Sequence, residues 1–240
     1  MQTDTTTNCH DCPAYQNNLF RYVSPDNLAK TKKYPQKFKK GSYIFQRSES
    51  SSNLYCVQSG RVQLFRAGTL REQTFSVAEK GSWVGCRDVI SSRTYQHDAR
   101  CLNTTVACRI EKKTILNLLE TEKNLDFVKG LVQNMATGWC DAEYMSYNLG
   151  TRKVMERLAD FLLKVNENGN SGGDSETNEN ISRELDFPFT REIVATIIGT
   201  TTESVIRTFS DFKSRGWIDF TRGKLKLNNI SAIKNIADNS

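Results

Sequence analysis

The chain has 240 residues and a formal net charge of +6; 38% of its residues are hydrophobic and 25% are charged. No apolar run approaches the roughly 20 residues that cross a bilayer, and the N-terminus lacks the basic and apolar regions of a signal peptide. Seven scattered cysteines indicate reduced thiols rather than a disulfide scaffold. The composition therefore predicts a cytoplasmic globular protein of one or two domains with no membrane partner.

The first half of the chain has the pattern of a small β-domain. Short alternating segments separated by glycines occupy residues 38–110, and they predict an antiparallel sandwich or roll. Helical periodicity follows, with a short helix near residues 112–119, a long helix over 125–149 and a further helix over 152–165. Residues 166–180 contain no apolar side chain and predict a flexible linker.

The long helix carries two apolar registers that overlap. The first contains Val128, Leu131, Met135, Gly138, Ala142, Met145 and Leu149, and the second contains Val132, Met135, Trp139, Ala142 and Leu149. Either set packs against its own domain, or it forms the seam of a parallel coiled-coil dimer. The small residues Gly138 and Ala142 favour the dimer, since they let two backbones approach closely.

Two short helices after the linker predict a helix-turn-helix. Thr190 is a plausible N-cap for a helix over 191–198, Gly199 supplies a turn, and Thr201 is a plausible N-cap for a second helix that ends near Arg215. The core face of the second helix is predicted to contain Val205, Phe209 and Phe212.

The opposite face of the second helix carries residue types that recognise DNA bases. Glu203 can accept a hydrogen bond from cytosine, Arg207 can donate two to guanine, and Ile206 can contact a thymine methyl group. Thr202 and Ser204 accompany them in the first turn, where a recognition helix meets the bases. The alternative is an ordinary surface ion pair between Glu203 and Arg207.

A hairpin predicted over residues 217–227 has the form of a wing with a basic turn. Its turn residues Arg222 and Lys224 are candidate phosphate contacts. The whole stretch from Phe189 to Leu227 closely resembles the winged helix of the CRP/FNR family of bacterial transcription regulators. The order of roll, long helix and winged helix is similar too, and the FNR-like branch matches best.

The resemblance implies an α+β fold with a jelly roll like those that bind cyclic nucleotides, a dimerisation helix and a C-terminal winged helix-turn-helix. It implies a homodimer that binds an inverted repeat in double-stranded DNA, with RNA polymerase as a partner and no enzymatic activity. The family's base-reading Glu and Arg fall on Glu203 and Arg207. Ile206 stands where the FNR branch has Ser, and Thr202 stands where the CRP branch has Arg.

The expected domains follow from this order. They are an N-terminal cysteine-containing arm (1–27), the sensor roll (28–123), the dimerisation and hinge helices (124–165), the linker (166–180) and the winged helix (181–240).

The effector of the roll is not expected to be a cyclic nucleotide. In the members that bind one, a Glu follows the glycine turn and an Arg-Ser or Arg-Thr pair binds the phosphate. The turn here, 81–85, has no Glu after it, and the pair falls on Tyr95 and Gln96. An off-register pair, Arg93 and Thr94, is an alternative.

The cysteines suggest a different signal. Cys9 and Cys12 form a C-x2-C pair, a spacing that can chelate a metal or an iron–sulfur cluster. The resemblance to FNR-type sensors adds Cys108 as a ligand, but a further arm ligand falls on Asn18, a poor ligand for iron. Asp11, His10 or another cysteine is the alternative at that position. Cys56 and Cys86 are not expected to take part. Incidental thiols, a thiol–disulfide switch and an enzymatic dithiol at Cys9 and Cys12 are the alternatives.

Overall fold

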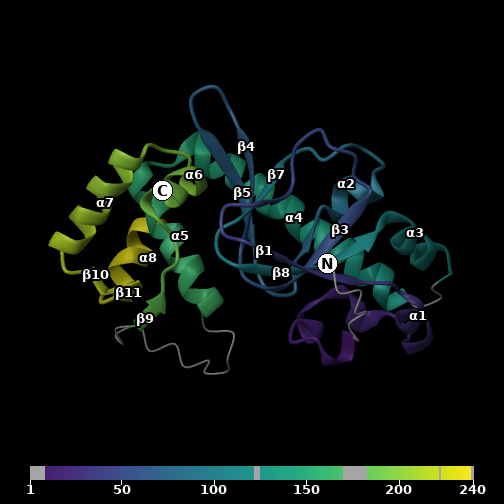
Figure 1. The fold of residues 1–240 in the computed structure, drawn as a ribbon. Helices are drawn as coiled ribbons and strands as arrows, with labels where there is room; N and C mark the ends of the chain where they lie inside the picture. The colour runs from purple at the N-terminus through teal and green to yellow at the C-terminus, as the bar shows by residue number, and fades with distance from the viewer. Residues whose placement is uncertain (1–8, 122–124, 170–182, 222, 239–240) are drawn as a thin grey trace. The chain divides into compact units, whose positions relative to one another are not determined.

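The computed structural model describes residues 9–121, 125–169, 183–221 and 223–238. The chain divides into two compact units, Met1–Ala142 and Glu143–Ser240, and Figure 1 shows the elements of each. Within the described ranges, no helix is both long and apolar enough to cross a membrane. The finer division into five segments stays a prediction.

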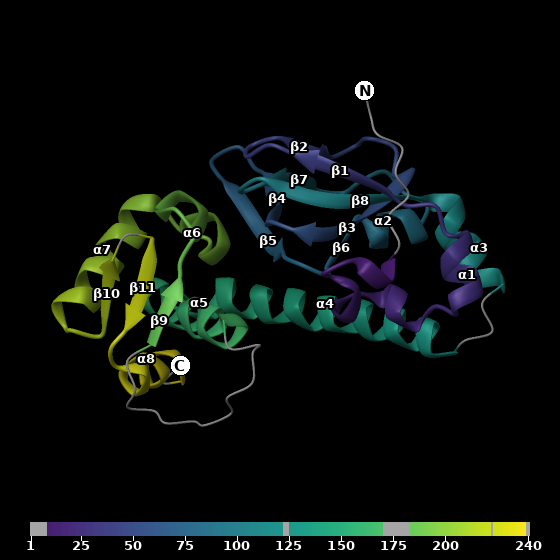
Figure 2. The same ribbon diagram turned by 60° about the horizontal axis from the view of Figure 1, so that its bottom comes forward.

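The first unit contains two four-stranded antiparallel sheets, which confirms the predicted roll (Figure 2). One sheet has the order β1 (Tyr34–Phe38), β8 (Thr105–Glu111), β3 (Asn53–Ser59), β6 (Trp83–Val84). The other has the order β2 (Tyr43–Phe45), β7 (Asp98–Cys101), β4 (Val62–Ala67), β5 (Glu72–Ala78). Side chains from both sheets, such as Phe45, Val57 and Ala107, form one buried core.

Alternate residues of β3 and β8 face away from that core. Leu54, Cys56, Cys108 and Ile110 belong instead to a second buried cluster, which the arm and the following helices complete. The arm forms three 3-10 turns, η1 (Cys9–Asp11), η2 (Tyr15–Asn17) and η3 (Leu19–Tyr22), and is followed by α1 (Pro25–Lys30). The roll also carries α2 (Cys86–Ile90) and α3 (Lys112–Thr121).

The long helix α4 (Leu125–Thr151) begins where it was predicted and packs against the arm. At Gly130 the backbone of α4 comes so close to the Tyr22 ring that an added Cβ would lie 2.9 Å from it. The next helix, α5 (Val154–Gly169), extends four residues beyond its predicted end. The expected linker therefore does not begin at residue 166: Asn166 is helical and buried, and residues 170–180 lie outside the described ranges.

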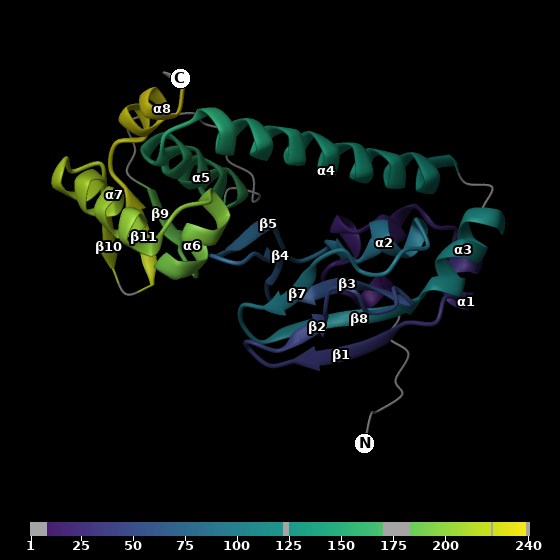
Figure 3. The same ribbon diagram turned by 90° about the horizontal axis from the view of Figure 1, so that it is seen from above.

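The second unit combines α5 with a three-stranded sheet and three helices (Figure 3). The sheet has the order β10 (Ile218–Thr221), β11 (Lys224–Leu227), β9 (Arg183–Asp186), and all its pairings are antiparallel. The helices are α6 (Arg191–Ile198), α7 (Thr202–Ser214) and α8 (Ile230–Asp238). Their apolar faces form one core with α5, and in it the Arg191 guanidinium stacks on Phe209 and Phe220.

Candidate nucleic-acid interface and sensor site

The helix-turn-helix begins and turns where its sequence predicts. The hydroxyl of Thr190 accepts a hydrogen bond from the Ile193 amide, and that of Thr201 accepts one from the Ser204 amide, both at 3.3 Å. Each side chain thus satisfies a free amide at a helix start. Between the helices, Gly199 has a φ of 66°, a left-handed conformation that suits glycine.

The two faces of α7 are separated as predicted. Val205, Phe209 and Phe212 are buried in the core, whereas Glu203 and Arg207 are exposed and Ile206 is 50% exposed. Thr202 and Ser204 are half-buried in the first turn. Within the described residues, no ion pair joins Glu203 to Arg207. Their polar groups are therefore available to a ligand on this face.

The hairpin of β10 and β11 has the form expected of the wing. Thr221 pairs with Lys224, and Gly223 between them has a φ of 81°. The Lys224 ammonium is half exposed and lies 3.7 Å from the Glu184 carboxylate, so a phosphate would compete with a weak surface ion pair. The other candidate at this turn, Arg222, lies outside the described residues.

The burial of residues along α4 distinguishes the two apolar registers predicted for the dimer seam. Leu131 is buried in the core of its own unit together with Phe127, so it is not available to a partner helix. This corrects the first register at that position, because the arm and roll cover this face of α4. Several other candidates are exposed or half-buried in the single chain: Val128, Val132, Met135, Gly138, Trp139, Ala142 and Met145.

A small pocket in the first unit brings together thiols that are far apart in the sequence. Cys9 and Cys12 of the arm line it together with Cys56 of β3 and Cys108 of β8. Phe20, Lys33, Asn18 and Gln58 complete the lining. The three cysteines predicted as ligands therefore share one site, and Cys56, which was expected to take no part, belongs to it as well. Only the strand register reveals Cys56, and no local motif marks it.

Burial controls the chemistry of these thiols. It raises the pKa of Cys108 to about 12, with Cys12 and Cys9 adding to the effect. Burial also raises the pKa of Cys9 and of Cys56. Cys86 is buried outside the pocket and has its pKa raised to about 12 by burial alone. All seven cysteines are free thiols.

The donor set of the pocket suits a soft metal centre, because thiolates are the ligands of iron–sulfur clusters. Within the described residues, no three His, Cys, Asp or Glu side chains converge closely enough to hold a single ion. The four thiols are instead spread around the pocket wall. A cluster accepts such a spread, since each thiolate binds a different iron atom.

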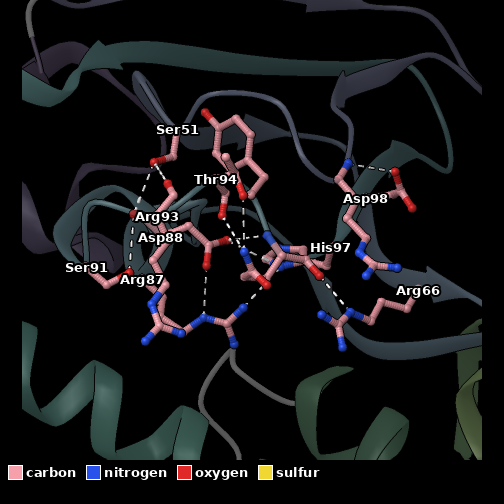
Figure 4. A network of polar contacts seen from close by, with 12 residues as sticks. Ser51, Arg66, Arg87, Asp88, Ser91, Arg93, Thr94, His97 and Asp98 are labelled. Carbon is pink, nitrogen blue, oxygen red and sulfur yellow. Dashed lines mark hydrogen bonds and ion pairs between the residues drawn. The ribbon is translucent and has the colours of Figure 1, made fainter.

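Aromatic and acidic side chains occupy the position expected for a cyclic-nucleotide phosphate. The Tyr95 ring is buried and stacks on Phe45 with 3.7 Å between centroids. Beside it, the buried Asp88 carboxylate accepts from the Gln96 amide at 3.3 Å and lies 3.6 Å from His97 (Figure 4). A buried carboxylate would repel a phosphate at this position.

Arg87 and His97 complete this polar network. The Arg87 side chain donates to Asp88 at 3.3 Å and contacts Nδ1 of His97 at 3.4 Å. Burial lowers the pKa of His97, and the Asp88 charge opposes that effect. The alternative Arg93 is exposed, and its backbone amide donates to the Asp88 carbonyl.

Comparisons with known proteins agree with both units. A model of the cyclic nucleotide-binding domain matches residues 35–122, and a model of the Crp-like helix-turn-helix domain matches residues 156–236. The chain belongs to the CRP/FNR family of transcription regulators. The match of both domain models, in this order, decides the assignment.

Individual relatives of this CRP/FNR protein are distant. It is 25% identical to the fumarate and nitrate reduction regulatory protein of Salmonella typhi, over 95% of this chain and 90% of that one. It is 23% identical to the transcriptional activator protein anr of Pseudomonas aeruginosa, over 80% of this chain and 76% of that one. The structure of FixK2 from Bradyrhizobium japonicum has a similar fold, with a TM-score of 0.74, 20% identity and coverage of 85% and 96%.

Proposed function

We propose that this CRP/FNR regulator is a homodimer that binds an inverted repeat in double-stranded DNA, and that redox, oxygen or metal status controls its DNA affinity. The observation that carries the sensing part is the shared pocket of Cys9, Cys12 and Cys108, which joins the arm to the roll. The name of one relative, the fumarate and nitrate reduction regulatory protein, refers to redox reactions and supports the same signal.

The DNA-binding part rests on the exposed face of α7. Glu203 and Arg207 would contact base edges, Ile206 a thymine methyl group, and Thr190, Thr201, Thr202 and Ser204 the region around the helix start. Lys224, and Arg222 by its place in the sequence, would contact phosphates. In a homodimer, two such helices would enter successive major grooves, about 34 Å apart. RNA polymerase is the expected partner at a promoter.

The exposed seam of α4 supports the dimer. Val132, Met135 and Trp139 are all large apolar side chains exposed on a single helix. A row of this kind is typical of a surface that another copy covers. The regulator is then a cytoplasmic protein whose two copies meet along α4.

The thiols would hold an iron–sulfur cluster, which supplies oxygen- and redox-sensitive chemistry when bound. The buried Tyr95 side chain occupies the position expected for the phosphate of a cyclic nucleotide, and the nearby Asp88 carboxylate would repel that phosphate. Both features argue against a cyclic nucleotide as the effector. An enzymatic dithiol is disfavoured because Cys9 is buried and its pKa is raised by burial, whereas a catalytic dithiol needs an accessible thiolate.

Protein purified without air tests this function. Iron and acid-labile sulfide are measured first, and binding to a labelled inverted repeat is then compared before and after exposure to air. We expect a coloured, iron-bearing dimer whose specific DNA affinity changes with oxidation. A colourless, iron-free protein whose DNA binding ignores oxidation and reduction would contradict the sensing part.

A further inference from the structure

Cys56 occupies a position in the roll that sequence motifs do not reveal. In the antiparallel pair of β3 and β8, Cys56 lies directly opposite Cys108. Directly opposed residues project to the same face of a sheet. Both thiols are buried, at 4% and 7% exposure, and both line the pocket that the arm closes with Cys9 and Cys12.

The arm offers no further thiol to this pocket. Asn18 lines it, but both ends of its side chain are used within the arm. Its oxygen accepts from the Phe20 amide at 2.7 Å, and its nitrogen donates to the Ala14 carbonyl at 2.9 Å. Asn18 therefore stabilises the turn of the arm, and binding a metal would compete with these two hydrogen bonds.

Lys33 provides an independent sign that the pocket holds a negatively charged group. Its side chain lines the pocket and is 4% exposed. The ammonium donates to the Leu28 carbonyl at 3.1 Å and to the Cys9 thiol, and no carboxylate of the described residues forms an ion pair with it. A buried cation without a counter-charge is costly, so the fold favours an anion beside it.

Trp83 adds a buried N–H donor next to the Cys56 thiol. It lies directly opposite Cys56 on the other neighbouring strand, β6. Its indole nitrogen is buried, has no nitrogen or oxygen acceptor among the described residues, and donates toward the Cys56 sulfur, which lowers the pKa of that thiol against the larger effect of burial. N–H groups of this kind commonly donate to the sulfur atoms of a cluster and tune its potential.

We propose that Cys56 is the fourth ligand of an iron–sulfur cluster whose other ligands are Cys9, Cys12 and Cys108, with Lys33 as the neighbouring cation. The proposal rests on the proposed redox function and assigns its missing ligand. Two ligands come from the arm and two from adjacent strands of one sheet. Each thiol releases its proton to solvent as its sulfur binds iron.

Two matched variants test the assignment of Cys56. Cys56→Ala removes a buried thiol that lines the pocket, and Cys86→Ala removes a buried thiol that does not. Iron, sulfide and visible absorbance are measured on dimers purified without air, and circular dichroism checks folding. We expect Cys56→Ala to lower iron content by more than about tenfold, since even outer partners of a metal site contribute about that much. Cys86→Ala should match the wild type.

A rescue variant keeps the test valid if Cys56→Ala is poorly folded. Because Asn18 lines the same pocket, Cys56→Ala/Asn18→Cys restores four thiols around it, and we expect iron to return. Wild-type iron content in Cys56→Ala would overturn the assignment of Cys56 while leaving the redox function intact. Zinc alone, or no metal, in the wild type would overturn the cluster and with it this proposal.

The role of Lys33 has its own readout. Lys33→Met removes the buried cation, and Lys32→Met removes an exposed one next to it. We expect Lys33→Met to shift the midpoint potential of the bound cluster to a more negative value, because the reduced cluster carries more negative charge. Equal potentials in the two variants would overturn the role given to Lys33.

Discussion

Trp139 is the side chain through which the proposed dimer can be tested most directly. It is 71% exposed in the single chain. A tryptophan can bury about 150–250 Å², so covering the exposed part is worth about 3 kcal/mol per copy at about 25 cal/mol/Å². A symmetric seam contains the residue twice, but ordering costs reduce the realised gain. We expect Trp139→Ala to weaken dimerisation by about 3 kcal/mol, roughly 100-fold in Kd.

Sedimentation equilibrium of the metal-loaded protein over a range of concentrations gives this constant. Leu70→Ala is the matched control, because Leu70 is 97% exposed on the turn between β4 and β5 and is not part of α4. That variant should keep the wild-type Kd, and neither substitution should alter the unfolding of the monomer. A Trp139→Ala dimer as tight as the wild type would show that Trp139 lies outside the interface.

Three further predictions concern DNA binding, acid stability and helix capping. Arg207→Ala should weaken binding to the cognate site by about 1–3 kcal/mol and relax the preference at one base. Lys224→Ala should weaken binding to all DNA sequences equally and flatten the salt dependence of the affinity. An equal loss of affinity for all DNA sequences in Arg207→Ala would refute its contact with a base. Because burial lowers the pKa of His97, the unfolded chain binds its proton more readily, so stability should fall as pH drops below about 6.5. Urea unfolding of His97→Gln should show a smaller loss over that window, and an unchanged pH profile would contradict this. Thr201→Ala should lower the stability of the second unit by about 1 kcal/mol in thermal unfolding, and an unchanged transition would show that the cap contributes little.

Local signals explain why the DNA-binding unit was predictable. Thr190 and Thr201 cap helices, Gly199 supports a left-handed turn, and the faces of α7 follow from a period of 3.6 residues. Each of these features depends on neighbours within one or two turns. The bounds of α6 were therefore predicted to the residue, and those of α7 to within one residue at its end.

Long-range packing explains what the sequence alone could not show. The role of Cys56 depends on strand register, because only its pairing with Cys108 brings it to the pocket. Leu131 fits an apolar heptad, yet the arm and roll, not a partner, cover its side of α4. The end of α5 was missed because its polar final residues give no apolar period, although Asn166 is buried.

The close approach of the Tyr22 ring to Gly130 means that the arm packs tightly against the N-terminal part of α4. An α-helix rises about 1.5 Å per residue, so Trp139 lies about 14 Å along α4 from the contact at Gly130. A tilt of about 5° at Gly130 would displace Trp139 by roughly 1 Å, close to the helix shifts of about 1–2 Å that switch subunit interfaces. A change at the thiols that moved the arm would therefore also move the exposed surface of α4 that carries Trp139, without any unfolding of the roll.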